Sequence, residues 1–156
     1  KGFEKFSPKR IILDNKLKTK LNSYIIKTVN KKNTLIFYNK ANKAKVLNFK
    51  KKGVQLIKSK INKKNRFDIK MVLKKLYSLG NRNLLIEGGD VLTNSLIKFK
   101  IFNKFYLFKS SKNLSKSSEY LKFNSLNVLN QKYKIKINLK LNIRKDRITL
   151  YKKQNV

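Results

Sequence analysis

Apolar and polar residues alternate along this chain in two kinds of segment. Short, nearly continuous apolar runs predict strands at residues 9–14, 34–38, 54–57, 84–86 and 105–108. Segments that suit helices lie between them, at residues 41–52, 69–79 and 90–98. Because strands alternate with helices, we predict a mainly parallel sheet with helices on both faces.

The predicted helix at 69–79 has the clearest start and stop signals. Asp68 is a residue type that favours the position before a helix, and Gly80 is typical of the position after one. The apolar side chains that fall on one helical face are Ile69, Val72, Leu73 and Leu76. We expect this face to lie in the core.

The C-terminal part of the chain follows a different pattern. Residues 133–141 alternate Lys with Ile, Asn and Leu, which predicts a half-exposed strand, and residues 147–151 are expected to pair with it as an antiparallel hairpin at the sheet edge. A segment rich in Ser, Lys and Asn at 110–118 predicts a polar loop. We see no repeat or interdomain linker, so we predict one three-layer α/β/α domain over residues 1–156.

The most informative segment covers residues 84–92. A predicted buried strand reaches Glu87, continues into Gly88 and Gly89, and leads into a helix that begins at about Asp90. Two glycines allow a tight turn and a close approach of the backbone to a ligand. The N–H groups at the start of a helix favour an anion such as a phosphate. The same residues also suit an ordinary turn with a surface ion pair at Glu87, and both readings remain open at this point.

The charge of the chain points first to a polyanionic partner. Lys and Arg number 41 against 7 Asp and Glu, for a formal net charge of +34. Nearly all of these cations are Lys, whereas surfaces that read nucleic acids favour Arg. The joint abundance of Lys, Asn and Ile is typical of an AT-rich genome. We therefore favour compositional bias over a dedicated nucleic-acid function, and expect only salt-sensitive, non-specific binding to polyanions.

Several kinds of chemistry are excluded by residue types that the sequence lacks. It contains no Cys and no His, which excludes disulfides, thiol nucleophiles, imidazole acid–base catalysis and a zinc site of the usual ligands. No apolar run reaches the length of about eighteen residues that a membrane span needs. We expect a cytoplasmic protein with no metal and no membrane partner.

Taken together, these motifs resemble a known family. The strand over Pro8 to Asp14, the Leu79-Gly80 pair and the segment from Asn83 to Gly89 match, in order, the C-terminal reductase domain of the bacterial bifunctional riboflavin-biosynthesis deaminase/reductase. The helix and the strand at 105–108 that follow also match, and the resemblance covers roughly residues 7–152. The Ile-Glu-Gly-Gly turn is its most specific part.

The resemblance implies a fold similar to dihydrofolate reductase and a specific activity. That activity is the NADPH-dependent reduction of 5-amino-6-(5-phosphoribosylamino)uracil to the ribitylamino product. The resemblance assigns a catalytic role to no side chain of this sequence. By motif, Glu87 matches a carboxylate that contacts substrate. The positions that match cofactor contacts are Asn15, Gly89, Asp90, Val91, Leu92, Thr93, Asn94 and Ser95. Members of the family usually self-associate, so the resemblance also implies a homodimer.

The chain departs from the family pattern at two places. The family's Asp-Asn-Pro-x-Leu-x-x-Arg segment, the first strand and helix of its reductase domain and its zinc-binding deaminase domain would lie before Lys1, so we expect the chain to be a piece of a longer protein. Asp90 stands where the family often has a small residue or Pro, and a carboxylate there can cap the helix or repel a phosphate. The alternative function, an RNA- or ribosome-associated basic domain, would need aromatic or Arg-rich recognition patterns, and we find none.

Overall fold

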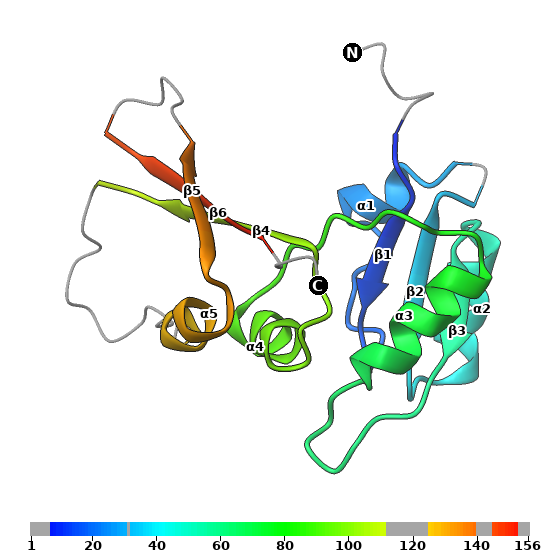
Figure 1. Ribbon diagram of the computed structural model, residues 1–156. Coiled ribbons are helices and arrows are strands. Elements are labelled where there is room, and N and C mark those ends of the chain that lie inside the picture. The colour runs from blue at the N-terminus through cyan, green and yellow to red at the C-terminus, as the bar shows by residue number, and fades with distance from the viewer. Residues whose placement is uncertain (1–6, 31, 112–124, 140–144, 153–156) are drawn as a thin grey trace, which may run out of the picture. The chain divides into compact units, whose positions relative to one another are not determined.

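The computed structural model describes residues 7–30, 32–111, 125–139 and 145–152 (Figure 1). The chain divides into two compact units, Lys1–Arg82 and Asn83–Val156, and each is described by itself. No helix of the described residues is long and apolar enough to cross a membrane. The prediction that the whole chain is a single domain stays a prediction.

The first unit contains a three-stranded parallel sheet with the order β1-β2-β3. Its strands are β1 (Arg10–Leu13), β2 (Thr34–Tyr38) and β3 (Gln55–Lys58). The central strand β2 is buried from Thr34 to Phe37, so both of its faces are covered. A nearly continuous apolar run is the pattern that such a strand requires, and the three predicted strands are confirmed.

Helices cover both faces of this sheet. In Figure 1, α3 (Ile69–Ser78) crosses in front of the strands, whereas α1 (Tyr24–Lys27) and α2 (Lys43–Lys51) lie behind them. The core on the side of α1 and α2 contains Leu17, Ile26, Ile36, Phe49 and Val54. On α3, the predicted stripe is confirmed, with Ile69, Val72 and Leu76 buried.

Helix ends in this unit follow the predicted signals. Asp68 accepts hydrogen bonds from the N–H groups of Lys70 at 2.9 Å and Met71 at 3.4 Å, which caps α3. Gly53 and Gly80, beyond the ends of α2 and α3, both have φ of +81°, a conformation that glycine adopts without steric cost. The short helix α1 was not predicted, because four residues are too few to show a helical period.

The second unit contains a three-stranded antiparallel sheet and two helices. Its elements are α4 (Asp90–Lys98), β4 (Lys104–Lys109), α5 (Leu126–Lys132), β5 (Ile135–Leu139) and β6 (Arg147–Lys152). Its core contains Ile97, Leu129, Tyr133 and Tyr151. The Tyr133 ring stacks on Phe102 with centroids 4.4 Å apart. The predicted pairing of β5 with β6 is confirmed.

Three details of the predicted fold are corrected. The segment 84–86 forms no strand, and Leu85 is 88% exposed. A strand needs a neighbouring strand for its backbone hydrogen bonds, and no strand of the described residues pairs with this segment. Strand β6 lies between β4 and β5 instead of at an edge, in keeping with its buried Ile148 and Leu150. Helix α5 was not predicted. Most of the predicted loop at 110–118 lies outside the described residues.

The turn after β1 is organised by Asp14. Its Oδ2 accepts hydrogen bonds from the backbone N–H of Thr19 at 2.7 Å and from the Thr19 hydroxyl at 2.8 Å. Burial by itself raises the pKa of Asp14, but hydrogen bonds from the backbone of Thr19, Lys18 and Lys16 and from the Thr19 hydroxyl together outweigh it and lower the pKa below its ordinary value of 3.8. The ionised carboxylate therefore stabilises the turn that buries Leu17.

This lowered pKa predicts a pH dependence of stability. A depressed carboxyl pKa contributes stability above the unfolded value of 3.8 and loses it as pH falls through the folded value. We expect Asp14→Asn to be less stable than wild type by about 1 kcal/mol at neutral pH, with the gap narrowing below about pH 4. Urea unfolding from pH 3 to 7 measures it. Thr19→Val keeps the backbone N–H donor, so it should lose less stability than Asp14→Asn. A stability difference between wild type and Asp14→Asn that does not change with pH would contradict the prediction.

Candidate functional site

The start of α4 offers backbone N–H groups to an incoming anion. Gly89 is the N-cap residue, has extended backbone angles (φ −74°, ψ 178°) and provides no side-chain cap. The first hydrogen bond of the helix runs from the Thr93 N–H to the Gly89 carbonyl at 3.2 Å. The three N–H groups before it, those of Asp90, Val91 and Leu92, therefore have no acceptor among the described residues. These groups carry the positive end of the helix dipole, which favours a phosphate.

The two glycines before this helix have different surroundings. A Cβ at Gly88 would lie 2.8 Å from Cδ2 of Leu92, so Gly88 allows the turn to pack against the first turn of α4. A Cβ at Gly89 would meet nothing within 4 Å. The space beside Gly89 is therefore open, and a ligand could approach the backbone there directly.

Asp90 is held by two side chains of the same unit. One oxygen, Oδ1, accepts a hydrogen bond from Ser125 Oγ at 2.9 Å, and the other, Oδ2, accepts one from Asn94 Nδ2 at 3.0 Å. Ser125 is fully buried, so Asp90 satisfies a hydroxyl that has no access to water. The carboxylate thus ties the start of α4 to the residue before α5, and neither oxygen caps the first turn of α4.

The later residues of the predicted cofactor segment lie in the second turn of α4. Ser95 donates its hydroxyl to the Val91 carbonyl at 3.0 Å, and the Asn94 amide is engaged by Asp90. Thr93 is half-buried. Among the predicted residues 89–95, the available donors are therefore the backbone N–H groups of the first turn. The side chains of Asn94 and Ser95 are already hydrogen-bonded within the helix.

Glu87 lies just before the glycine turn and is exposed. Across the part of the chain that the structure describes, no hydrogen bond or ion pair involves its carboxylate, which argues against a surface ion pair as its role. The structure thus brings Glu87 and residues 89–95 together along one turn and one helix of the second unit.

Asn15 belongs to the first unit, directly after Asp14. Its Nδ2 donates to the Asn65 carbonyl at 3.1 Å. Its own carbonyl accepts hydrogen bonds from the N–H groups of Asn39 and Lys40, both at 2.9 Å. Asn15 is therefore fixed between the ends of β1 and β2, where open parallel sheets bind ligands.

Sequence reasoning missed Ser125 as a support of the site. A Ser before the helix over Leu126–Lys132 is a possible helix-start signal in the sequence. Its hydroxyl instead reaches Asp90, a residue 35 positions earlier. No local pattern predicts such a long-range contact.

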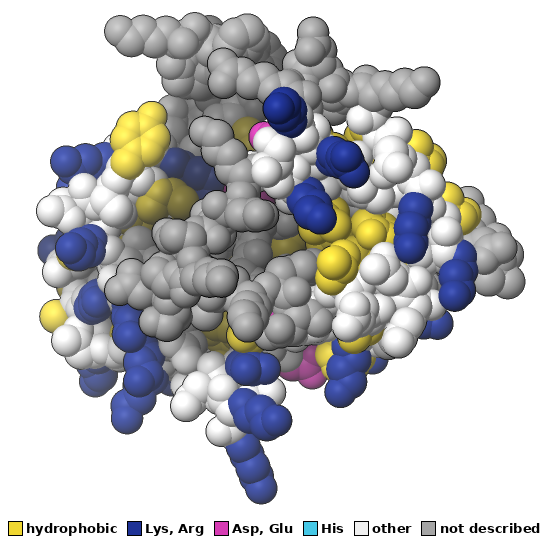
Figure 2. Space-filling model, turned by 90° about the vertical axis from the view of Figure 1, so that its left-hand side faces the viewer, with side chains coloured by type: hydrophobic (Ala, Val, Ile, Leu, Met, Phe, Trp, Pro, Cys, Tyr) yellow, Lys and Arg dark blue, Asp and Glu magenta, His cyan; other side chains and the backbone are white. Residues whose placement is uncertain are grey.

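The described Lys and Arg side chains on one face can be followed in Figure 2. The figure shows Lys and Arg side chains at several separate places on the face toward the viewer, with other side chains between them. Nucleic-acid-binding domains typically concentrate their cations on one surface. The visible distribution gives no support to the alternative of an RNA- or ribosome-associated domain.

Comparisons with known proteins agree with the resemblance. A family model described as the RibD C-terminal domain matches residues 1–142. The chain is 33% identical over 105 residues to the riboflavin biosynthesis protein RibD of Aquifex aeolicus (strain VF5) and 30% identical over 105 residues to that of Actinobacillus pleuropneumoniae. In each case the match covers 67% of this chain and 28% of the relative, so the chain spans less than a third of their length.

Solved structures share the fold. Two structures of Acinetobacter baumannii RibD, form 2 and form 1, match with TM-scores of 0.65 and 0.63, both at 17% identity. The matches cover 93% and 94% of this chain and 37% and 38% of those chains. They confirm the predicted α/β class with its parallel sheet and antiparallel hairpin, similar to dihydrofolate reductase. With the family model matching most of its length, the chain belongs to the RibD C-terminal domain family, as the Ile-Glu-Gly-Gly turn and the other matched motifs predicted.

Proposed function

We propose that this chain carries the reductase site of riboflavin biosynthesis, in which NADPH reduces 5-amino-6-(5-phosphoribosylamino)uracil to its ribitylamino product. The observation that carries the proposal is the start of α4, where uncapped N–H groups border the open space at Gly89, directly after the exposed Glu87. Membership of the RibD C-terminal domain family supports the reaction class.

The start of α4 suits the phosphate groups of the cofactor. The N–H groups of Asp90, Val91 and Leu92 would hold a phosphate without any side chain between it and the helix. The Asp90 carboxylate opposes this charge, but its two oxygens are engaged by Ser125 and Asn94. We propose that these two bonds hold the carboxylate back from the phosphate, which reduces the repulsion.

Glu87 suits the substrate. When bound, the nicotinamide would supply a hydride from its C4 to C1′ of the ring-opened sugar, in which C1′ is doubly bonded to the amino nitrogen, and that nitrogen would take up a proton from water. The protein's task is then mainly to hold the two reacting atoms together. Glu87 would orient the substrate by accepting hydrogen bonds from its N–H or hydroxyl groups.

The further assignments follow the same proposal. We propose that Asn15 contacts the cofactor, that the protein acts in the cytoplasm, and that it works as a homodimer. Its partners would be the pyrimidine ribonucleotide-derived substrate and NADPH, with no specific nucleic acid and no membrane.

The activity itself is tested on the gene product that contains this chain. We expect NADPH oxidation, followed as loss of absorbance, that depends on the ribosylaminopyrimidine phosphate and yields the ribitylamino product. Absence of substrate-dependent oxidation by the full gene product would contradict the proposal.

Gly89 tests the cofactor site. Its backbone angles suit any residue and its surroundings are open, so Gly89→Val should fold with an unchanged melting temperature. The new side chain would fill the space where the phosphate approaches, and the loss of one charge-assisted hydrogen bond at about 1.5–3 kcal/mol should raise the Kd for NADPH at least ~10-fold. Gly89→Ala should show a smaller effect of the same sign.

The measurement for Gly89 is a fluorescence titration of NADPH beside a melting curve. An unchanged Kd in Gly89→Val would place the cofactor elsewhere. A lowered melting temperature would show that the position is needed for packing.

Glu87 tests the substrate site. Glu87→Gln keeps the size of the side chain but removes its charge, and we expect kcat/KM to fall at least ~10-fold, equivalent to about 1.4 kcal/mol of transition-state binding. The Kd for NADPH should stay nearly constant. Asp146→Asn is the matched control, since Asp146 is an exposed carboxylate of the same unit that bonds Ser111 N–H at 3.0 Å in a loop. If kcat/KM is the same in Glu87→Gln and Asp146→Asn, Glu87 does not contact the substrate.

A further inference from the structure

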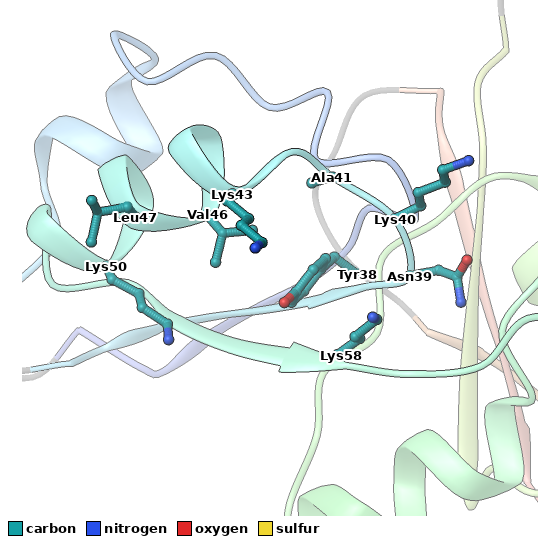
Figure 3. Close-up of a pocket in the computed structure, with 9 residues that line it drawn as sticks. All are labelled: Tyr38, Asn39, Lys40, Ala41, Lys43, Val46, Leu47, Lys50 and Lys58. Carbon is teal, nitrogen blue, oxygen red and sulfur yellow. The ribbon is translucent and has the colours of Figure 1, made fainter.

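The first unit contains a pocket of about 470 Å³ between α2 and the ends of β2 and β3 (Figure 3). One wall is a single face of α2, formed by Lys43, Val46, Leu47 and Lys50, which follow one another at helical spacing. The other wall is the pair Tyr38 and Lys58, which lie opposite each other on β2 and β3. Regular elements of one unit therefore shape the pocket.

The pocket has an apolar middle and cationic ends. Lys43 and Lys50 are two helical turns apart, a distance of about 10 Å along the axis, and Val46 and Leu47 lie between them. In Figure 3 both lysines extend from α2 toward the strands, with the Tyr38 ring between α2 and Lys58, whereas Lys40 points away. A flat ring would find contact surface in the middle, and an anion would find a lysine at either end.

The lysines of this pocket lack counter-charges. No carboxylate lines the pocket, and within the described ranges no hydrogen bond or ion pair involves the side-chain amines of Lys43, Lys50 or Lys58. Lysines are common throughout this chain, so their number alone decides nothing. The distinguishing feature is that they surround a hollow that also contains an aromatic ring and two aliphatic side chains, a mixture that suits a small molecule.

We propose that this pocket binds a nucleoside phosphate. The base would lie on the Tyr38 ring and against Val46 and Leu47, and the phosphate would be held by the ammonium groups at the pocket ends, as point charges. Nothing in the cofactor or substrate assignment above uses these residues. A volume of about 470 Å³ is within the range of small-molecule sites.

Two sources of a nucleoside phosphate are compatible with this chemistry. One is a free nucleotide. The other is the adenosine phosphate end of NADPH, because Asn39 and Lys40, which line the pocket, donate their N–H groups to the Asn15 carbonyl. Only the second source rests on the proposed reductase function, and binding itself is tested without any measurement of activity.

The test is calorimetric titration of the purified protein with AMP at a fixed, physiological ionic strength. The triple variant Lys43→Gln, Lys50→Gln and Lys58→Gln should bind AMP at least ~10-fold more weakly. The matched control removes the same charge elsewhere in the unit, from Lys27 on α1 and from Lys74 and Lys75 on α3, all exposed. It should change the Kd less than ~2-fold, and circular dichroism should show that both variants fold.

Two further measurements identify which part of the ligand binds and where the nucleoside phosphate comes from. Tyr38→Leu should weaken AMP binding while leaving the binding of inorganic phosphate unchanged, since only the base contacts the ring. Displacement of AMP by NADPH would identify the pocket with the cofactor's adenosine end, and failure to displace would indicate a free nucleotide; both support the site. Equal weakening in the pocket and control variants, or no AMP binding to wild type, would overturn the proposal, since the net charge of the chain would then explain any binding.

Discussion

The burial of β2 on both of its faces is the constraint on which the first unit depends. Thr34 to Phe37 form a strand with no face that water can reach, so helices must cover the sheet on both sides. The parallel direction of β1, β2 and β3 then brings the carboxyl ends of all three strands to one edge. Asp14, Asn15 and the residues after β2 meet there because of the sheet, although they are far apart in sequence.

The second unit reaches its candidate site by a different route. Its antiparallel sheet and its two helices share the core around Ile97, Leu129 and Tyr151. The contact between Asp90 and the buried Ser125 ties the first turn of α4 to the residue before α5. An anion site made from backbone N–H groups needs a fixed helix start, since such donors lose their value when they move relative to the ligand. The Asp90 carboxylate, whose charge opposes a phosphate, therefore has a structural role at the start of α4.

The two candidate sites use positive charge in different ways. At α4 the charge comes from backbone dipoles, is fixed in direction and needs no basic side chain. In the pocket beside α2 it comes from flexible lysines around an apolar middle. The Lys and Arg side chains visible in Figure 2 lie among other side chains. Salt screens such exposed charges, so we expect them to contribute to solubility and non-specific attraction more than to recognition.

The sequence by itself determined the local elements and the family. Apolar runs marked β1, β2 and β3, Asp68 and Gly80 marked the ends of α3, and the Ile-Glu-Gly-Gly turn marked the start of α4, because capping and periodicity act over a few residues. Tertiary structure decided what depends on distant partners. The run at 84–86 has strand propensity but no described partner strand. Strand β6 is central because it pairs with β4 on one side and with β5 on the other, and the Asp90 carboxylate accepts its hydrogen bond from the distant Ser125. The α2 pocket is likewise a product of tertiary structure, since its lysines become neighbours of Tyr38 only when helix and sheet pack together.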